Sequence, residues 1–209
     1  MLLRILTRVL PGVLLMMGLV PSAGAAGTTY SVVESKSSVK VHVGKSGAFS
    51  FAGHKHEVLA PVSGTVTADP ANLPGSSVVL TFSTGKMQVV AESEPKGDAP
   101  KVEEVMRGPK VLDVTRFPDI RFKSTKVTGR ALPGGAYELT LVGELSLHGI
   151  TKEISVPVRV AVEGRGLTAT GETTLLHDQF GMERVSAGGG TVKVKNEIGI
   201  SFRIVAEQK

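Results

Sequence analysis

The chain has 209 residues and a formal net charge of +5, from 24 lysines and arginines against 19 aspartates and glutamates. It contains no cysteine, which excludes thiol redox catalysis, thiolate metal sites and cysteine nucleophiles. Tryptophan is also absent and no basic cluster lies beside an aromatic platform, so we expect no nucleic-acid partner.

The N-terminal segment has the pattern of a secretory signal peptide. Arg4 and Arg8 precede an apolar run over residues 9–20, and residues 21–26 supply the small side chains of a cleavage site. The run has 12 residues, fewer than the about 20 that a membrane-spanning helix requires. The pattern therefore predicts export, with a retained N-terminal anchor as the alternative.

The export signal also sets the expected boundaries of the mature protein. We expect cleavage after Ala25, so that residues 1–25 form the signal peptide and residues 26–209 form one mature domain. Cleavage removes two arginines and lowers the formal net charge from +5 to +3. The expected product is periplasmic or secreted and has no stable membrane span.

Apolar and polar side chains alternate with a period of two through most of residues 38–204. One dry face and one wet face per strand are typical of an antiparallel sheet that closes over a single interior. Turn clusters rich in glycine and proline separate the runs, and residues 133–135 and 164–166 have the composition of hairpin connections. The alternating runs cover residues 39–43, 62–68, 78–82, 120–122, 137–147, 154–163, 167–175 and 192–204. They predict an all-β fold, an antiparallel barrel of about eight strands.

One polar segment, residues 95–118, interrupts the alternation. Pro100 is placed to begin a helix and Gly108 to end it. Three apolar residues at i, i+3 and i+4 form one stripe, namely Val102, Val105 and Met106. We predict a short helical segment near residues 100–115 that plugs or flanks one end of the barrel, or whose stripe simply belongs to the core.

Three motifs then occur in a fixed order along the chain. They are Val-Leu-Asp-x-x-x-Phe-Pro-x-Ile-x-Phe over residues 111–122, Gly-Glu-Leu-Ser-Leu-His-Gly-Ile-Thr-Lys over residues 143–152, and Phe180-Gly181. This series resembles the YceI-like family of bacterial, lipocalin-like barrel proteins, which are typically periplasmic and bind polyisoprenoids. The resemblance spans residues 29–206. It implies a barrel that holds a polyisoprenoid or similar apolar lipid for transport, storage or a stress response.

The sequence departs from the usual pattern of the family in two places. The family commonly has an Arg-x-Asp-Phe-Gly run late in the chain, whereas residues 177–181 here read His-Asp-Gln-Phe-Gly. His177 and Gln179 therefore stand at the positions of that arginine and aspartate. The run over residues 53–57, Gly-His-Lys-His-Glu, marks a His-rich branch.

The apolar faces supply candidate residues for the wall of a lipid cavity. At about 0.8 kcal/mol per buried CH₂, one five-carbon isoprene unit contributes about 4 kcal/mol before ordering costs. Gly64, Gly143 and Gly171 occupy inward positions, where they either open space inside the barrel or allow strands to bend and approach closely. The candidate lining residues are Val41, Phe49, Phe51, Leu80, Phe82, Phe122, Leu141, Val158, Phe180, Ile200 and Phe202.

Two polar residues are candidate anchors for a ligand. Asn196 falls in the inward row of the last strand, where a buried amide needs hydrogen-bond partners. Alternatively, the Asn196 amide forms its hydrogen bonds with a neighbouring strand, or the residue lies at the barrel rim. His177 lies beside Asp178 and either contacts a head group or faces solvent.

The histidines allow a second interpretation, a periplasmic protein that handles a metal or haem. His54 and His56 share one face of a strand, and His42, His148 or His177 would have to supply a third ligand. No spacing of a known metal-binding motif is present, so we assign no metal site and no cofactor.

An enzyme is the interpretation with the weakest support. The chain has no Gly-x-Ser-x-Gly elbow and no phosphate-binding loop, so we predict a binding protein without catalytic activity. An interaction module that uses residues 95–118, and a homodimer, remain further alternatives.

Overall fold

The structure is a computed structural model that describes residues 27–46, 55–187 and 192–209. The predicted signal peptide, Phe49, Phe51 and His54 therefore lie outside the described residues.

The described chain is built almost entirely from strands of one antiparallel sheet. The strands are β1 (Thr28–Val32), β2 (Ser38–Ser46), β3 (His56–Leu59), β4 (Val62–Ala68), β5 (Ser77–Ser83), β6 (Gln88–Val89), β7 (Asp119–Leu132), β8 (Ala136–Leu147), β9 (Ile150–Glu163), β10 (Gly166–Leu176), β11 (Ser186–Ala187) and β12 (Val192–Gln208). One α-helix, α1, covers Ala99–Arg107. Single 3₁₀ turns are η1 (Glu34–Lys36), η3 (Leu73–Gly75), η4 (Thr84–Lys86), η5 (Ala91–Ser93), η6 (Pro133–Gly135) and η7 (Asp178–Phe180).

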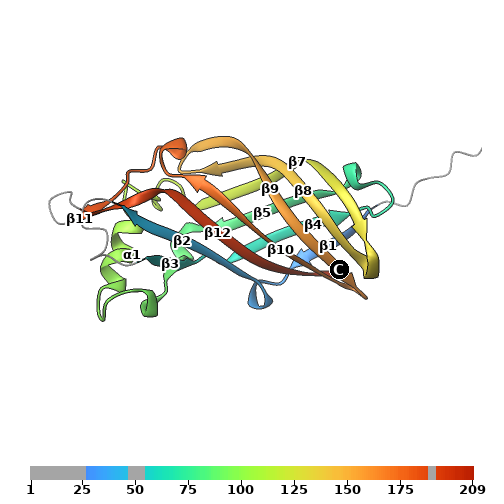
Figure 1. Cartoon of the computed structure of the whole chain (residues 1–209), viewed down its shortest axis with the longest axis horizontal. Helices are drawn as coiled ribbons and strands as arrows, with labels where there is room; N and C mark the ends of the chain where they lie inside the picture. Colours follow the sequence, from blue (N-terminus) through green and yellow to red (C-terminus); the bar gives the residue numbers. More distant parts are fainter. Residues whose placement is uncertain (1–26, 47–54, 188–191) are drawn as a thin grey trace, which may run out of the picture.

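Eight strands close into a barrel in the order β1-β4-β5-β7-β8-β9-β10-β12, and β1 pairs back onto β12. The long β12 also pairs with β2, from which β3 and β6 continue the wall. Figure 1 shows an elongated barrel with α1, β3 and β11 at one end and the C-terminus at the other. The predicted lipocalin-like, all-β barrel of about eight strands with one short helix is confirmed.

The tight connections follow from local sequence. β7 and β8 are joined through Gly134 and Gly135, with φ values of 75° and 74°. β8 and β9 are joined through His148 and Gly149, with φ values of 51° and 76°. The β8–β9 connection has only these two residues between the paired Leu147 and Ile150, and two successive positive φ values match the twist of such a hairpin. His148 is therefore a turn residue, and its Nδ1 donates a hydrogen bond to the Phe180 carbonyl oxygen at 3.1 Å.

The helix lies across one end of the barrel and contributes to its core. Val102 and Met106 pack against the buried side chains of the barrel, whereas Val105 is 46% exposed. The Arg107 guanidinium fixes the end of α1 by donating a hydrogen bond to the Met87 carbonyl oxygen at 3.0 Å. The helix thus covers an end of the barrel, and two of its three predicted apolar residues face inward. No helix in the described ranges is long and apolar enough to span a membrane.

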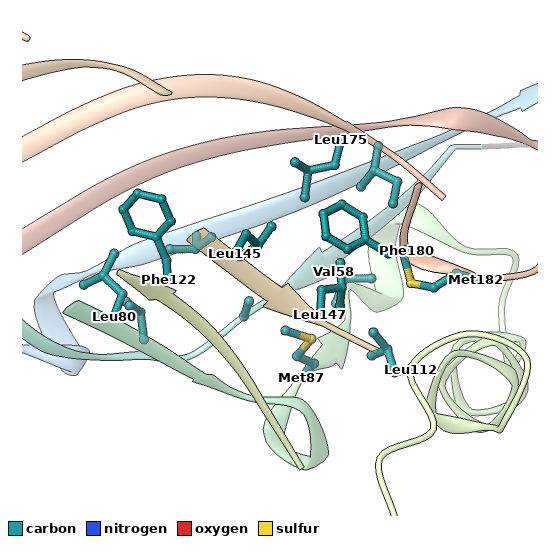
Figure 2. Close-up of a cluster of buried hydrophobic side chains, with 14 of the residues drawn as sticks. Val58, Leu80, Met87, Leu112, Phe122, Leu145, Leu147, Leu175, Phe180 and Met182 are labelled. Carbon is teal, nitrogen blue, oxygen red and sulfur yellow. The ribbon is translucent and has the colours of Figure 1, made fainter. Parts of the chain in front are cut away.

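Buried side chains form two clusters, one toward each end of the barrel. The cluster nearer α1 is drawn in Figure 2, where Phe180 lies among Leu175, Val58 and Met182. The second cluster contains Tyr30, Val156, Val158, Val160, Leu167 and Ala206. Between them, Leu141, Ile154 and Phe202 pack against both clusters while remaining partly exposed. All three side chains border an internal space.

The inward glycines allow close packing of strands and aromatic rings. A Cβ at Gly143 would lie 2.5 Å from the Lys123 carbonyl oxygen and 2.7 Å from Cζ of Phe122. A Cβ at Gly171 would lie 2.4 Å from the Pro157 carbonyl oxygen and 2.6 Å from Cζ of Phe202. The two rings therefore lie over glycines, against the wall, and close approach is what these glycines provide.

We predict that Gly143→Ala lowers the free energy of unfolding by about 1–3 kcal/mol, because the added methyl group forces Phe122 and the Lys123 backbone apart. Gly85→Ala is the matched control, since nothing lies within 4 Å of a Cβ placed there, and it should change stability by less than about 1 kcal/mol. Urea unfolding of both variants checks this. Equal stability of the two variants would contradict the packing role of Gly143.

Candidate binding cavity

The barrel encloses a cavity of about 850 Å³. Its wall extends from Val66 and Leu73 at the β4–β5 end to Val102 and Met106 of α1, so the cavity runs along the barrel. The inward rows of the strands make most of this wall, and they are valine, leucine, isoleucine and phenylalanine side chains. Binding cavities for small ligands have volumes of roughly 300–1,000 Å³ and predominantly apolar walls. The interior has the size and chemistry to hold a long apolar molecule.

Eight of the candidate residues border this cavity, namely Val41, Leu80, Phe82, Phe122, Leu141, Val158, Ile200 and Phe202. Phe180 is not part of the wall. Its side chain is 0% exposed and lies within the buried cluster of Figure 2. Phe180 belongs to the 3₁₀ turn η7, so the alternation of a strand does not determine where its side chain points. Phe49 and Phe51 lie outside the described residues.

Several lining residues were not among the candidates. Ile154, Val156 and Val160 border the cavity together with Val158, and Ala169 does so from β10. The same alternation that predicts Val158 places its neighbours on the same face, so the pattern contained this information. The lining by Val102 and Met106 depends instead on where α1 docks, which is a tertiary property.

At the β4–β5 end, the polar wall residues are engaged within their own turn. Oδ1 of Asp69 accepts hydrogen bonds from the backbone N–H groups of Ala71 and Asn72 at 3.1 Å and 3.0 Å. Ser76 Oγ accepts the backbone N–H of Asp69 at 2.9 Å. The hydroxyl of Thr67 lies 3.4 Å from that of Thr29. These groups stabilise the turn and leave this end of the cavity apolar in character.

At the α1 end, most charged wall residues form ion pairs. His56 Nδ1 lies 2.7 Å from Oε1 of Glu94, whose side chain is fully buried. Lys101 lies 3.2 Å from Asp98, and Glu183 lies 3.3 Å from Lys110. The His56–Glu94 contact connects β3 to the segment that leads into α1.

His177 faces the cavity from the end of β10 and is 4% exposed. Its backbone N–H and its Nδ1 both donate to the Asn196 carbonyl oxygen, at 2.9 Å and 3.1 Å. Burial lowers the pKa of the imidazole below its ordinary value, against the opposing effect of the carbonyl groups of Asn196 and Lys195. The predicted alternative in which His177 faces solvent therefore does not describe its position.

Asn196 is held by η7 and does not border the cavity. Its Nδ2 donates to Asp178 Oδ2 at 2.8 Å, and its Oδ1 accepts the Asp178 backbone N–H at 3.2 Å. The pairing of β12 with β2 shifts register between Val194 and Ile198, so Asn196 falls in a bulge and leaves the inward row.

The described ranges contain no cluster of side chains that would support the metal-binding interpretation. Within them, no three His, Asp or Glu side chains come together as metal ligands. His42 Nε2 lies 3.0 Å from Ser201 Oγ on the outer face, and His148 contacts Phe180. His54 lies outside the described residues, so a site that depends on it stays a prediction.

A closed antiparallel barrel around an apolar cavity defines a lipocalin-like fold. The chain belongs to the YceI-like family, whose domain matches residues 30–206. The predicted family membership is confirmed. No curated protein matches the sequence.

Solved structures with the same fold have low sequence identity. The chain is similar to BcnA of Burkholderia cenocepacia, with 22% identity and a TM-score of 0.62 over 83% of this chain and 98% of BcnA. It is also similar to a polyisoprenoid binding domain from Saccharophagus degradans, with 11% identity and a TM-score of 0.63 over 87% of this chain and 99% of that domain. The YceI protein of Campylobacter jejuni matches with 12% identity and a TM-score of 0.54, over 71% of this chain and 81% of that protein.

We predict that acidification removes a part of the stability that depends on His177. Because the native pKa lies below the ordinary 6.5, the unfolded chain binds a proton that the native chain excludes. The contribution of His177 to the free energy of unfolding is therefore fully present above about pH 6.5. It falls as the pH decreases below that value, by at most about 1.4 kcal/mol per pH unit. His177→Asn retains a donor near the position of Nδ1 but does not titrate. Urea unfolding at about pH 7.5 and about pH 5.5 should show a smaller loss for this variant; equal losses would contradict the role of His177.

Proposed function

We propose that the protein binds a polyisoprenoid or similar long-chain lipid in the barrel interior and acts as a binding protein rather than an enzyme. The observation that carries this proposal is the apolar cavity of about 850 Å³ along the barrel. Membership of the YceI-like family supports it, as does the fold shared with a polyisoprenoid binding domain.

The energetics favour an extended apolar ligand. Each five-carbon isoprene unit that leaves water contributes about 4 kcal/mol before the costs of ordering. A few units in contact with the wall therefore give useful affinity without a charged contact. Binding of this kind selects for length and width, because a wall of aliphatic side chains offers few directional interactions.

Partial occlusion of the cavity should weaken binding. Ala169 borders the cavity and packs against both buried clusters, whereas the next residue, Thr170, is exposed on the outer face. We predict that Ala169→Trp weakens binding of geranylgeraniol at least about tenfold, because the indole displaces ligand carbons from the wall, and that Thr170→Trp leaves it unchanged. Displacement of N-phenyl-1-naphthylamine, followed by fluorescence, measures both affinities.

Two results would contradict the proposal. One is unchanged affinity of a folded Ala169→Trp variant. The other is repeated recovery of protein without lipid when it is purified from its host, extracted with organic solvent and analysed by mass spectrometry.

We propose further that the protein works in the periplasm or outside the cell, as a carrier, store or stress-response factor for this lipid. The basic, apolar and small-residue order of residues 1–25 supports export. N-terminal sequencing of protein from the exported fraction should begin at Ala26. Full-length protein retained in the cytoplasmic fraction would contradict export.

A further inference from the structure

Two lysines that border the cavity, Lys45 and Lys193, have no ion pair within the described ranges, and Lys193 is exposed to solvent. Lys45 continues the inward row of β2 after Val39, Val41 and Val43, and it borders the cavity as they do. It is half-buried. A row that begins with three valines and ends in lysine changes from apolar to charged at the α1 end of the barrel.

The carboxylates that border this end of the cavity already have cationic partners. Asp98 pairs with Lys101 and Glu183 pairs with Lys110. The buried Glu94 close to them pairs with His56. Within the described ranges, Lys45 itself makes neither an ion pair nor a side-chain hydrogen bond. An ammonium group drawn out of water toward an apolar space is costly unless an anion accompanies it.

Strand register places Lys45 and His177 close to each other along the barrel, on either side of β12. Val194 of β12 is opposite Lys45 of β2, and on the other side of β12 the His177 backbone N–H donates to the Asn196 carbonyl oxygen. The two side chains therefore flank the bulge of β12 from its two neighbouring strands, β2 and β10, which are separated by two strand spacings, about 10 Å. Both border the cavity. His177 Nδ1 donates to the Asn196 carbonyl oxygen, which fixes the orientation of the imidazole at the cavity wall.

Among the described residues, the opposite end of the cavity has no such pair. Its polar residues, Thr67, Asp69 and Ser76, hydrogen-bond within or beside the β4–β5 turn. The cavity therefore has a direction, with an apolar end and an end where a cation and an imidazole face the interior.

We propose that Lys45, beside His177, binds an anionic head group such as a phosphate, and so selects anionic over neutral long-chain lipids and orients the chain toward the β4–β5 end. This proposal rests on the proposed function, because the aliphatic part of the ligand occupies the apolar cavity. It assigns Lys45 a role in specificity rather than in affinity for the chain itself.

The test compares geranylgeranyl phosphate with geranylgeraniol, which have the same chain and differ in charge. The wild-type protein should bind the phosphate about tenfold or more tightly than the alcohol, as expected for one charge-assisted contact in a partly buried site. Lys45→Met should remove this preference and leave the affinity for the alcohol unchanged. Lys45→Arg should retain the preference, and salt should weaken it in the wild type.

Lys195→Met is the matched control. Lys195 belongs to β12, is exposed on the outer face, and its Cδ lies 3.0 Å from a Cβ placed at Gly44, the neighbour of Lys45. This variant removes the same charge from the other side of the same pair of strands. It should keep the preference for the phosphate, because its charge does not face the cavity.

The outcomes separate the two proposals. Equal affinity of the wild type for phosphate and alcohol, or a preference that survives Lys45→Met, overturns the role of Lys45 and leaves lipid binding intact. Failure of both lipids to displace N-phenyl-1-naphthylamine overturns the proposed function as well. Inorganic phosphate that binds as tightly as geranylgeranyl phosphate would show a site for the free anion and overturn the selection of a lipid.

Discussion

The barrel depends on the pairing of one strand, β12, with neighbours from both ends of the chain. β12 pairs with β10 along Gly166–Leu176, with β2 from Lys193 to Arg203 and with β1 through its last residues. Without these pairings β10 would present an open edge and the inward apolar rows would face water. Because β1 and β2 precede every other strand, this closure requires residues separated by most of the sequence. The interior exists as a closed space only after β12 has joined the two ends.

The interior remains open because large side chains lie along the wall instead of across it. The Phe122 and Phe202 rings lie over Gly143 and Gly171 and therefore occupy little of the cavity. Valines supply much of the remaining wall, and their short side chains do not reach its centre. The fold is stabilised by the backbone hydrogen bonds between neighbouring strands and by a cluster of buried side chains toward each end of the barrel. The barrel can therefore be stable although side chains do not fill its centre. In a barrel packed with side chains, the same central side chains provide the stability and fill the space.

The sequence predicted the parts of this fold that repeat with a period of two and missed the parts where the period breaks. β8, β9 and β10 were visible because each keeps one apolar face. Much of β7 was missed because a register shift between Ser124 and Lys126 interrupts its alternation. The same kind of shift beside Asn196 moved that residue out of the inward row. Phe180 lies in a 3₁₀ turn, where alternation carries no information about direction. The proximity of Lys45 and His177 on either side of β12 depends on the register of three strands. No local sequence pattern contains this information.

An unfilled apolar cavity also has a thermodynamic consequence for the protein without a ligand. The side chains on the wall lack contact partners on one side, so the empty barrel forgoes the dispersion energy that a packed core provides. On the proposed function, a lipid would restore these contacts and bind the closed barrel rather than the unfolded chain, so it would stabilise the native state by mass action. Lipid binding would therefore be coupled to closure by β12, because the cavity wall includes Ile198, Ile200 and Phe202 of that strand. The strand that creates the cavity is the strand that a bound lipid would hold in place.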